Sequence, residues 1–164
     1  MNSRIQESIW RQFGASIDML EEAIILCPMD VWNIESKFWY NAFHCLFFLD
    51  YYLTKDPISF CPPAPFTESE FEDKMPGKIY TKQELLNYLR FNRDKCRILI
   101  SGLTEDGLQD RWINASGTMN YSMLEILLYN MRHVQHHVAQ LNLILRQTIN
   151  ESPKWISQCK SELL

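Results

Sequence analysis

The chain has 164 residues, of which 46% are hydrophobic and 22% are charged. These ordinary values exclude a disordered or fibrous chain and predict that residues 1–164 form a single domain. The net charge of −4, without a local cluster of Lys and Arg, argues against nucleic acid as a partner. The first residues lack an apolar stretch of signal-peptide length, and no run of about 20 residues is free of polar groups. Together with five scattered cysteines that form no CxxC pair, this predicts a cytoplasmic protein without a membrane partner.

Two helices are predicted in the first third of the chain. Between residues 5 and about 26, apolar residues recur at steps of three and four, which is the helical period, and Pro28 marks the end of this pattern. A second helix is predicted over residues 36–54, because this segment lacks Gly and Pro and is too long for a strand. Its aromatic residues fall on all sides of the helix, so we expect it to be largely buried.

A long connection follows between residues 56 and 78. It contains five prolines and mixed charges, a composition typical of irregular but ordered structure, and it is long enough to span a bundle from end to end. The aromatic residues Phe60, Phe66 and Phe71 predict that the segment packs over the helices as a strap. We refer to residues 57–78 as the strap.

Two capping boxes introduce the remaining long helices. Thr81 with Glu84 predicts a helix that continues to about residue 103, and Ser122 with Glu125 predicts another that continues to about residue 145. Residues 112–119 fit either a two-stranded excursion or a plain loop, and residues 155–163 are predicted to form a short C-terminal helix. The expected fold class is therefore all-α, a four-helix bundle with a long ordered loop between its second and third helices.

The four histidines all fall inside predicted helices. At 100° per residue, His133 and His137 lie about 40° apart and one turn from each other, so both imidazoles can reach one ion. Apolar neighbours place this pair on the core face, whereas His136 points to a polar, exposed face. His44 on the second helix can supply a third ligand, and three protein ligands leave one position of a tetrahedral ion open. The competing interpretation is that these are hydrogen-bonded structural histidines, because HxxxH spacing often arises by chance.

Two stretches of the sequence resemble the DinB/YfiT-like family of metalloenzymes. They are FHCLFFLDYYL at residues 43–53 and RHVQHHVAQLNLILRQ at residues 132–147, and the resemblance extends over the whole chain. The family places one histidine on the second helix of a four-helix bundle and two, four residues apart, on the fourth. The resemblance thus implies His44, His133 and His137 as metal ligands. The sequence departs from the family pattern at Ala139, where glycine is frequent in HHxGQL, and in the residues FWYNAF ahead of His44.

A metal-dependent enzyme is the preferred interpretation. A divalent ion held by three neutral imidazoles keeps its full charge, and the helical wheel places neither Asp50 nor Glu125 near it. Such an ion lowers the pKa of bound water or deprotonates a bound thiol. We expect zinc or nickel, with iron as a third candidate. Tyr40, Tyr51 and Gln140 are candidates for polar contacts around the ligands, and the sequence identifies no catalytic residue.

The resemblance also suggests a reaction class and an oligomeric state. Some relatives are transferases or isomerases that use a low-molecular-weight thiol, others have no established reaction, and many are dimers. We therefore expect thiol-dependent S-transfer to a small electrophilic substrate, or else a hydrolase, in a homodimer. The alternative is a non-catalytic, metal-stabilised bundle that acts as a dimerisation or stress-response module, and a closed metal site would favour it.

Overall fold

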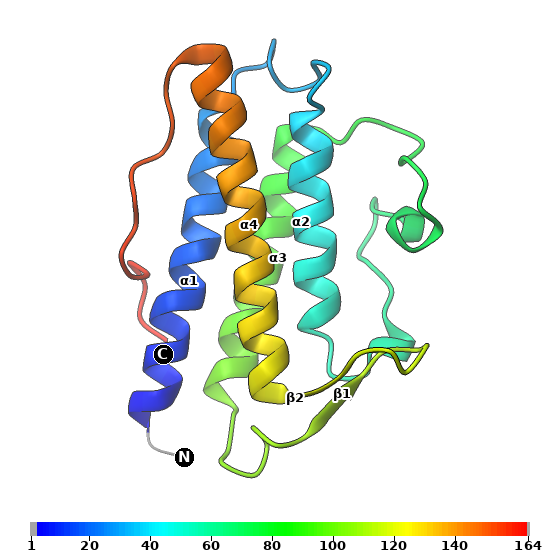
Figure 1. Ribbon diagram of the computed structural model, residues 1–164, viewed down its shortest axis with the longest axis vertical. Coiled ribbons are helices and arrows are strands. Elements are labelled where there is room, and N and C mark those ends of the chain that lie inside the picture. The colour runs from blue at the N-terminus through cyan, green and yellow to red at the C-terminus, as the bar shows by residue number, and fades with distance from the viewer. Residues whose placement is uncertain (1–2, 164) are drawn as a thin grey trace.

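A computed structural model describes residues 3–163, and within them four long helices form a bundle (Figure 1). These are α1 (Ser3–Leu26), α2 (Phe38–Tyr52), α3 (Lys82–Ser101) and α4 (Met123–Ile149). The predicted all-α four-helix bundle is confirmed. None of the helices in this part of the chain is long and apolar enough to cross a lipid bilayer.

The strap determines how the helices are arranged. It carries the chain from the end of α2 back to the opposite end of the bundle, so α3 runs in the same direction as α2 while α1 and α4 run the other way (Figure 1). Helices α1 and α2 each pack against both α3 and α4, and so face each other diagonally. The contact between α2 and α4 is the one that brings the histidines together.

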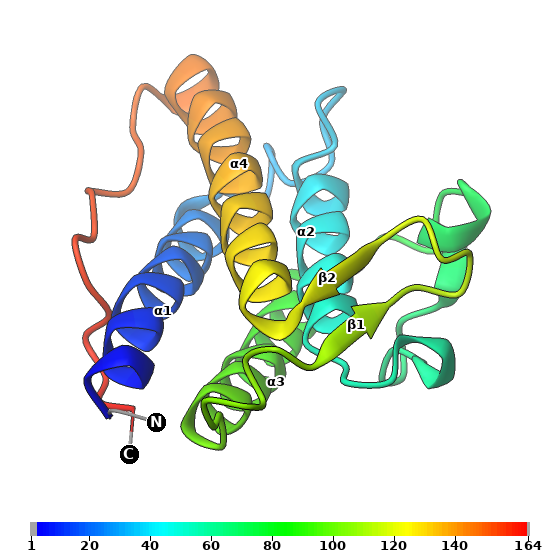
Figure 2. The same cartoon turned by 60° about the horizontal axis from the view of Figure 1, so that its bottom comes forward.

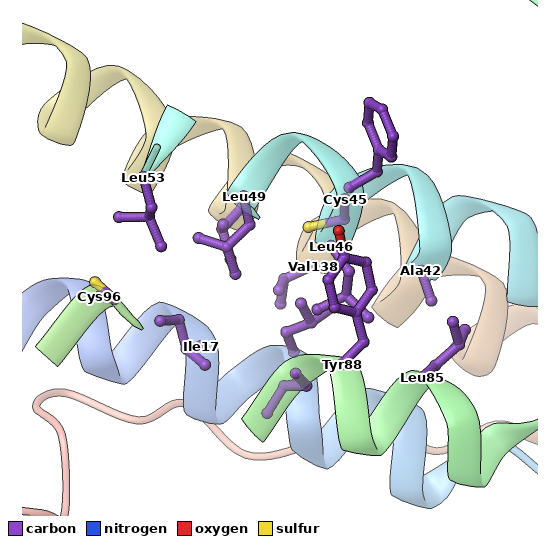
Figure 3. Packing of buried hydrophobic residues seen from close by; sticks show 14 of the residues in the cluster. Ile17, Ala42, Cys45, Leu46, Leu49, Leu53, Leu85, Tyr88, Cys96 and Val138 are labelled. Atoms are coloured by element: carbon purple, nitrogen blue, oxygen red, sulfur yellow. The ribbon is translucent and has the colours of Figure 1, made fainter. Parts of the chain in front are cut away.

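The core lies between all four helices, where side chains such as Ile17, Leu49, Tyr88 and Val138 converge (Figure 3). Eleven of the 15 residues of α2 are buried, which confirms the expectation drawn from its aromatic residues. This burial arises because the strap covers the side of α2 that the other helices leave free. Helix α2 therefore packs against α3, α4 and the strap.

Both predicted capping boxes are present. The hydroxyl of Thr81 accepts from the backbone N–H of Glu84 at the start of α3, and Ser122 and Glu125 repeat the arrangement at the start of α4. Between these helices lies a hairpin of β1 (Arg111–Ile113) and β2 (Asn120–Ser122), so residues 112–119 belong to a two-stranded excursion. Figure 2 shows the hairpin extending from α4 past the end of α2 toward the strap.

The strap is ordered and contains two short helices, η1 (Pro57–Ser59) and η2 (Glu68–Glu72). Its aromatic rings pack on the bundle as predicted. Phe60 contacts Phe47 of α2 with ring centroids 5.3 Å apart, and Phe66 stacks on Tyr88 of α3 at 4.3 Å. Phe71 lies 5.0 Å from Phe47, so the strap is attached to two helices through three rings.

The expected helix over residues 155–163 is wrong. This segment is extended and runs back along α1, where the backbone N–H of Cys159 donates to the carbonyl of Arg11 at 2.8 Å (Figure 1). The indole of Trp10 also donates to the Ser161 carbonyl at 3.0 Å. A short helix here would need a buried apolar face to offset the cost of nucleation, but Trp155 is 71% exposed.

Candidate metal centre

Helices α2 and α4 place three histidines in one cluster. His133 and His137 lie one turn apart on α4, with their Nε2 atoms 3.1 Å from each other. His44 faces them from α2, with its ring centroid 4.8 Å from that of His137 and 5.6 Å from that of His133. One ring nitrogen from each histidine lies within 4.8 Å of the other two. The structure thus brings together the three residues that the sequence singled out.

The cluster has suitable donors for a divalent transition metal. Two imidazole nitrogens bound to one tetrahedral ion lie roughly 3.3 Å apart, which the His133–His137 separation already matches. The Nδ1 atoms of His133 and His137 are buried without a hydrogen-bond partner in the described part of the chain. Their Nε2 atoms face each other at 3.1 Å, so these are the nitrogens that can bind one shared ion.

Burial sets the protonation of the pair on α4. Desolvation, followed by the charges of His137 and His44, lowers the pKa of His133 from 6.5 to about 3. Desolvation and the charges of the neighbouring histidines lower the pKa of His137 to about 4, although a hydrogen bond to the Gln140 side chain acts in the opposite direction. Both imidazoles are neutral at pH 7, which is the form that binds a metal.

Aromatic side chains surround the cluster. Phe48 lies 4.9 Å from the His44 ring and 5.8 Å from the His133 ring, and Tyr52 lies 5.9 Å from His133. These rings take the place of water around the imidazoles of His44 and His133. They contribute to the desolvation that lowers the pKa of His133.

The structure adds one residue that the sequence argument missed, Glu70. Its Oε2 lies 2.5 Å from the Nδ1 of His44, and its side chain is only 3% exposed. The helical wheel considered only Asp50 and Glu125, so it did not find this carboxylate. Glu70 comes from η2 in the strap, where no helical periodicity relates it to His44, so the only signal in the sequence was an acidic residue next to the aromatic Phe71.

Asp50 and Glu125, the two carboxylates placed on the helical wheel, lie away from the cluster as predicted. Asp50 is buried, where it accepts from the hydroxyl of Tyr88 and pairs with Lys95 at 2.5 Å. Glu125 completes the capping box of α4. Both residues have structural partners, which leaves Glu70 as the carboxylate in contact with a clustered histidine in the described residues.

The three residues predicted to surround the ligands have different positions. Tyr40 lies beside Glu70, and burial together with the charge and hydrogen bonding of Glu70 raises the pKa of this phenol to about 12. Tyr51 instead packs among aromatic rings, with Phe71 4.9 Å away. Gln140 is exposed and hydrogen bonds to the Nε2 of His136 at 3.1 Å. His136 itself is exposed, as the helical wheel predicted.

A shallow hollow lies on the surface of α4 beside His133. Its volume is about 460 Å³. Of the three clustered histidines, His133 contributes to its wall. The lining residues are Tyr129, Arg132, His133, Gln135 and His136. A small molecule in this hollow would lie next to a candidate ligand residue, within reach of aromatic, amide and cationic side chains.

A comparison with known families identifies the chain. A family model described as the DinB superfamily matches residues 12–141, a span that contains the whole histidine cluster. The chain belongs to the DinB superfamily. This confirms the resemblance seen in the sequence, and DinB proteins often bind metals. No curated protein and no solved structure matches the chain.

Proposed function

We propose that this DinB protein binds one divalent transition metal ion per chain through His44, His133 and His137. The observation that carries the proposal is the cluster itself, in which three partly buried imidazoles from two helices each place a ring nitrogen within 4.8 Å of the other two. Zinc and nickel are the preferred candidates and iron is the third, because imidazole suits all of them.

We further propose that the centre is catalytic. A divalent ion held by three imidazoles supplies Lewis acidity that lowers the pKa of a bound water or thiol. The chain contributes the remaining functions: Phe48 and Tyr52 limit water on one side, and the hollow beside His133 admits a small molecule on the other. An accessible hollow supports an open metal position and therefore a catalytic site over a purely structural one.

Thiol-dependent S-transfer is the reaction class that we propose for the centre. A low-molecular-weight thiol would occupy the open position, and a small electrophile would bind in the adjoining hollow. Support comes from the family resemblance and from the wall of the hollow, where the exposed Arg132 can bind an acidic group of either molecule. Hydrolysis of an ester or amide is the second candidate, because the same Lewis acidity serves it.

Metal binding is tested by elemental analysis of the purified protein and its variants. We expect about one zinc or nickel ion per chain in the wild type and almost none in His137→Ala. His136→Ala is the matched control, because His136 lies one residue away on the same helix but is exposed and outside the cluster. Loss of metal in His136→Ala with retention in His137→Ala would overturn the assignment of the ligands.

The catalytic part is tested with a panel of low-molecular-weight thiols and a chloro-aromatic electrophile. We expect metal-loaded wild type to accelerate thioether formation and His137→Ala to match the rate in buffer. If the wild type also matches buffer, S-transfer is rejected, and the panel is repeated with ester and amide substrates. Absence of metal-dependent turnover in both panels would favour the non-catalytic bundle, acting in dimerisation or stress response.

The cellular setting and the assembly are part of the same proposal. The five cysteines are free in the structure, which suits a reducing cytoplasmic environment. The proposed homodimer is based on the family resemblance, because many relatives are dimers. Light scattering tests it by measuring the molar mass in solution. A mass of one chain across the micromolar range would reject it.

A further inference from the structure

Glu70 is buried in a way that needs an explanation. Its side chain is 3% exposed, whereas the side chain of His44 beside it is 29% exposed. One carboxylate oxygen, Oε2, lies against the Nδ1 of His44, and the other, Oε1, is buried without a hydrogen-bond partner in the described part of the chain. Burying a carboxylate is costly unless positive charge and donors compensate for it. The donors beside this carboxylate are the Nδ1 of His44 and the hydroxyl of Tyr40, and no Lys or Arg forms an ion pair with it in the described part of the chain.

The position of Glu70 shows what kind of partner it can be. Glu70 is outside the group of residues whose ligand atoms all lie within 4.8 Å of one another, so its carboxylate lies behind His44. A carboxylate oxygen accepts, so the Nδ1 of His44 carries the proton. The lone pair of this imidazole is then on Nε2. Metal-binding histidines commonly have this arrangement, in which an outer carboxylate fixes the tautomer and increases the basicity of the ligand.

Of the three clustered histidines, His44 is the one whose Nδ1 contacts a carboxylate in the described residues. The Nδ1 atoms of His133 and His137 are buried and lack a partner in the described residues, whereas that of His44 is held by Glu70. His133 and His137 are oriented by the helix that carries both of them. His44 is alone on α2 and more exposed, so its orientation depends most on an outside contact.

The strap is attached to α2 at the residue next to Glu70. Phe71 packs against Phe47 at 5.0 Å, Tyr51 at 4.9 Å and Phe60 at 5.9 Å. Adjacent residues of η2 therefore perform two tasks, since Phe71 fixes the strap on the bundle and Glu70 holds His44. Any ligand that favours the oriented form of His44 also favours the attached strap, because binding and conformation are thermodynamically linked.

We infer that Glu70 is the positioning residue of the metal centre, and that it couples the ordering of the strap to metal occupancy. The inference rests on the proposed metal binding. Glu70 orients the Nε2 of His44 toward the metal position and supplies one negative charge that offsets part of the charge of a bound cation. That cation is the compensation that the buried carboxylate lacks in the histidine cluster alone.

The first test measures the affinity for zinc by chelator competition in wild type, Glu70→Ala and Glu70→Gln. We expect about 10–100-fold weaker binding in Glu70→Ala, which is the usual effect of losing such a partner. Glu70→Gln should lie between the two, because its amide oxygen still accepts from Nδ1 but carries no charge. Glu72→Gln is the matched control, since Glu72 belongs to the same short helix and pairs with the exposed Lys74.

The second test measures amide hydrogen exchange of residues 57–78 with and without zinc. We expect zinc to slow exchange in wild type and in Glu72→Gln, and to have little effect in Glu70→Ala. Thermal unfolding of the metal-free variants separates a folding defect from a loss of affinity. A merely structural Glu70 would change unfolding and leave the zinc affinity of the folded protein unchanged.

The outcomes distinguish this inference from the proposed function. If Glu70→Ala and Glu70→Gln bind zinc as tightly as wild type while His137→Ala does not bind it, the role of Glu70 is rejected and the metal site stands. Unchanged exchange of the strap on zinc binding would reject the coupling. If the wild type binds no metal, the proposed function and this inference both fail.

Discussion

Burial, more than neighbouring charge, controls the protonation of His133 and His137. Desolvation is the largest cause of both lowered pKa values, which fall from 6.5 to about 3 and about 4. The charged form is disfavoured because burial removes water from around both rings and because a second positive charge would lie next to the first. His133 and His137 therefore stay neutral, the form that binds a metal, down to mildly acidic pH.

These pKa values predict how the stability of the metal-free protein depends on pH. As pH falls from 6.5 toward 4, the two histidines take up protons in the unfolded chain but not in the folded one, so the free energy of unfolding falls. The slope from two such groups approaches about 2.7 kcal/mol per pH unit. Urea unfolding measures the free energy of unfolding between pH 7 and pH 4.5. This free energy should fall less steeply with pH in the double variant His133→Gln with His137→Gln than in the wild type. Equal slopes would mean that the histidines protonate freely in the folded state.

At the level of single residues, the sequence predicted which side chains share a face of a helix, because helical geometry alone determines this. The wheel separated His133 and His137 from His136, and the structure has the first two facing His44 and the third exposed. Glu70 could not be found in this way. It reaches His44 from an irregular segment whose path depends on aromatic packing, and no residue period links the two positions.

At the level of elements, the strap depends on its buried rings. Phe60 is 8% exposed and contacts Phe47 and Tyr51, so Phe60→Ala should lower the free energy of unfolding by about 3 kcal/mol. It should also make the strap sensitive to protease in the folded protein. Ile58→Ala is the matched control, because Ile58 is 73% exposed in the same segment and should change stability by less than about 0.5 kcal/mol. Similar effects of both variants would show that the strap is not held by its rings.

The C-terminal segment depends on a glycine of α1. A Cβ at Gly14 would lie 2.6 Å from the Sγ of Cys159, so Gly14→Ala must displace the segment even though alanine favours a helix by about 1 kcal/mol. We expect faster hydrogen exchange at residues 157–161 with the bundle intact. Adding Cys159→Gly should restore slow exchange, because it removes the two colliding atoms. Gly77→Ala has open space around its Cβ and should leave the segment unchanged.

At the level of the whole molecule, the helices could be predicted because each carries its own local signals. The period of apolar residues and the two capping boxes determine where helices form, whatever they pack against. The diagonal placement of α1 and α2 depends on the route of the strap, which the sequence indicated only through its length. The extended C-terminal segment was mistaken for a helix because its conformation is determined by contacts with α1 instead of by its own residues.

The same architecture predicts the effect of a metal on the whole bundle. An ion bound by His44 and by the pair on α4 joins α2 to α4 in the folded state only, so it stabilises that state by mass action. At zinc concentrations about 100 times the dissociation constant, the gain is about 2.7 kcal/mol. In a domain of this size that raises the Tm by about 5–10 °C. Thermal unfolding with zinc, and again with excess chelator, measures the shift. His137→Ala should unfold at the same temperature under both conditions, and a wild type that does likewise would show that the ion does not bind the folded bundle.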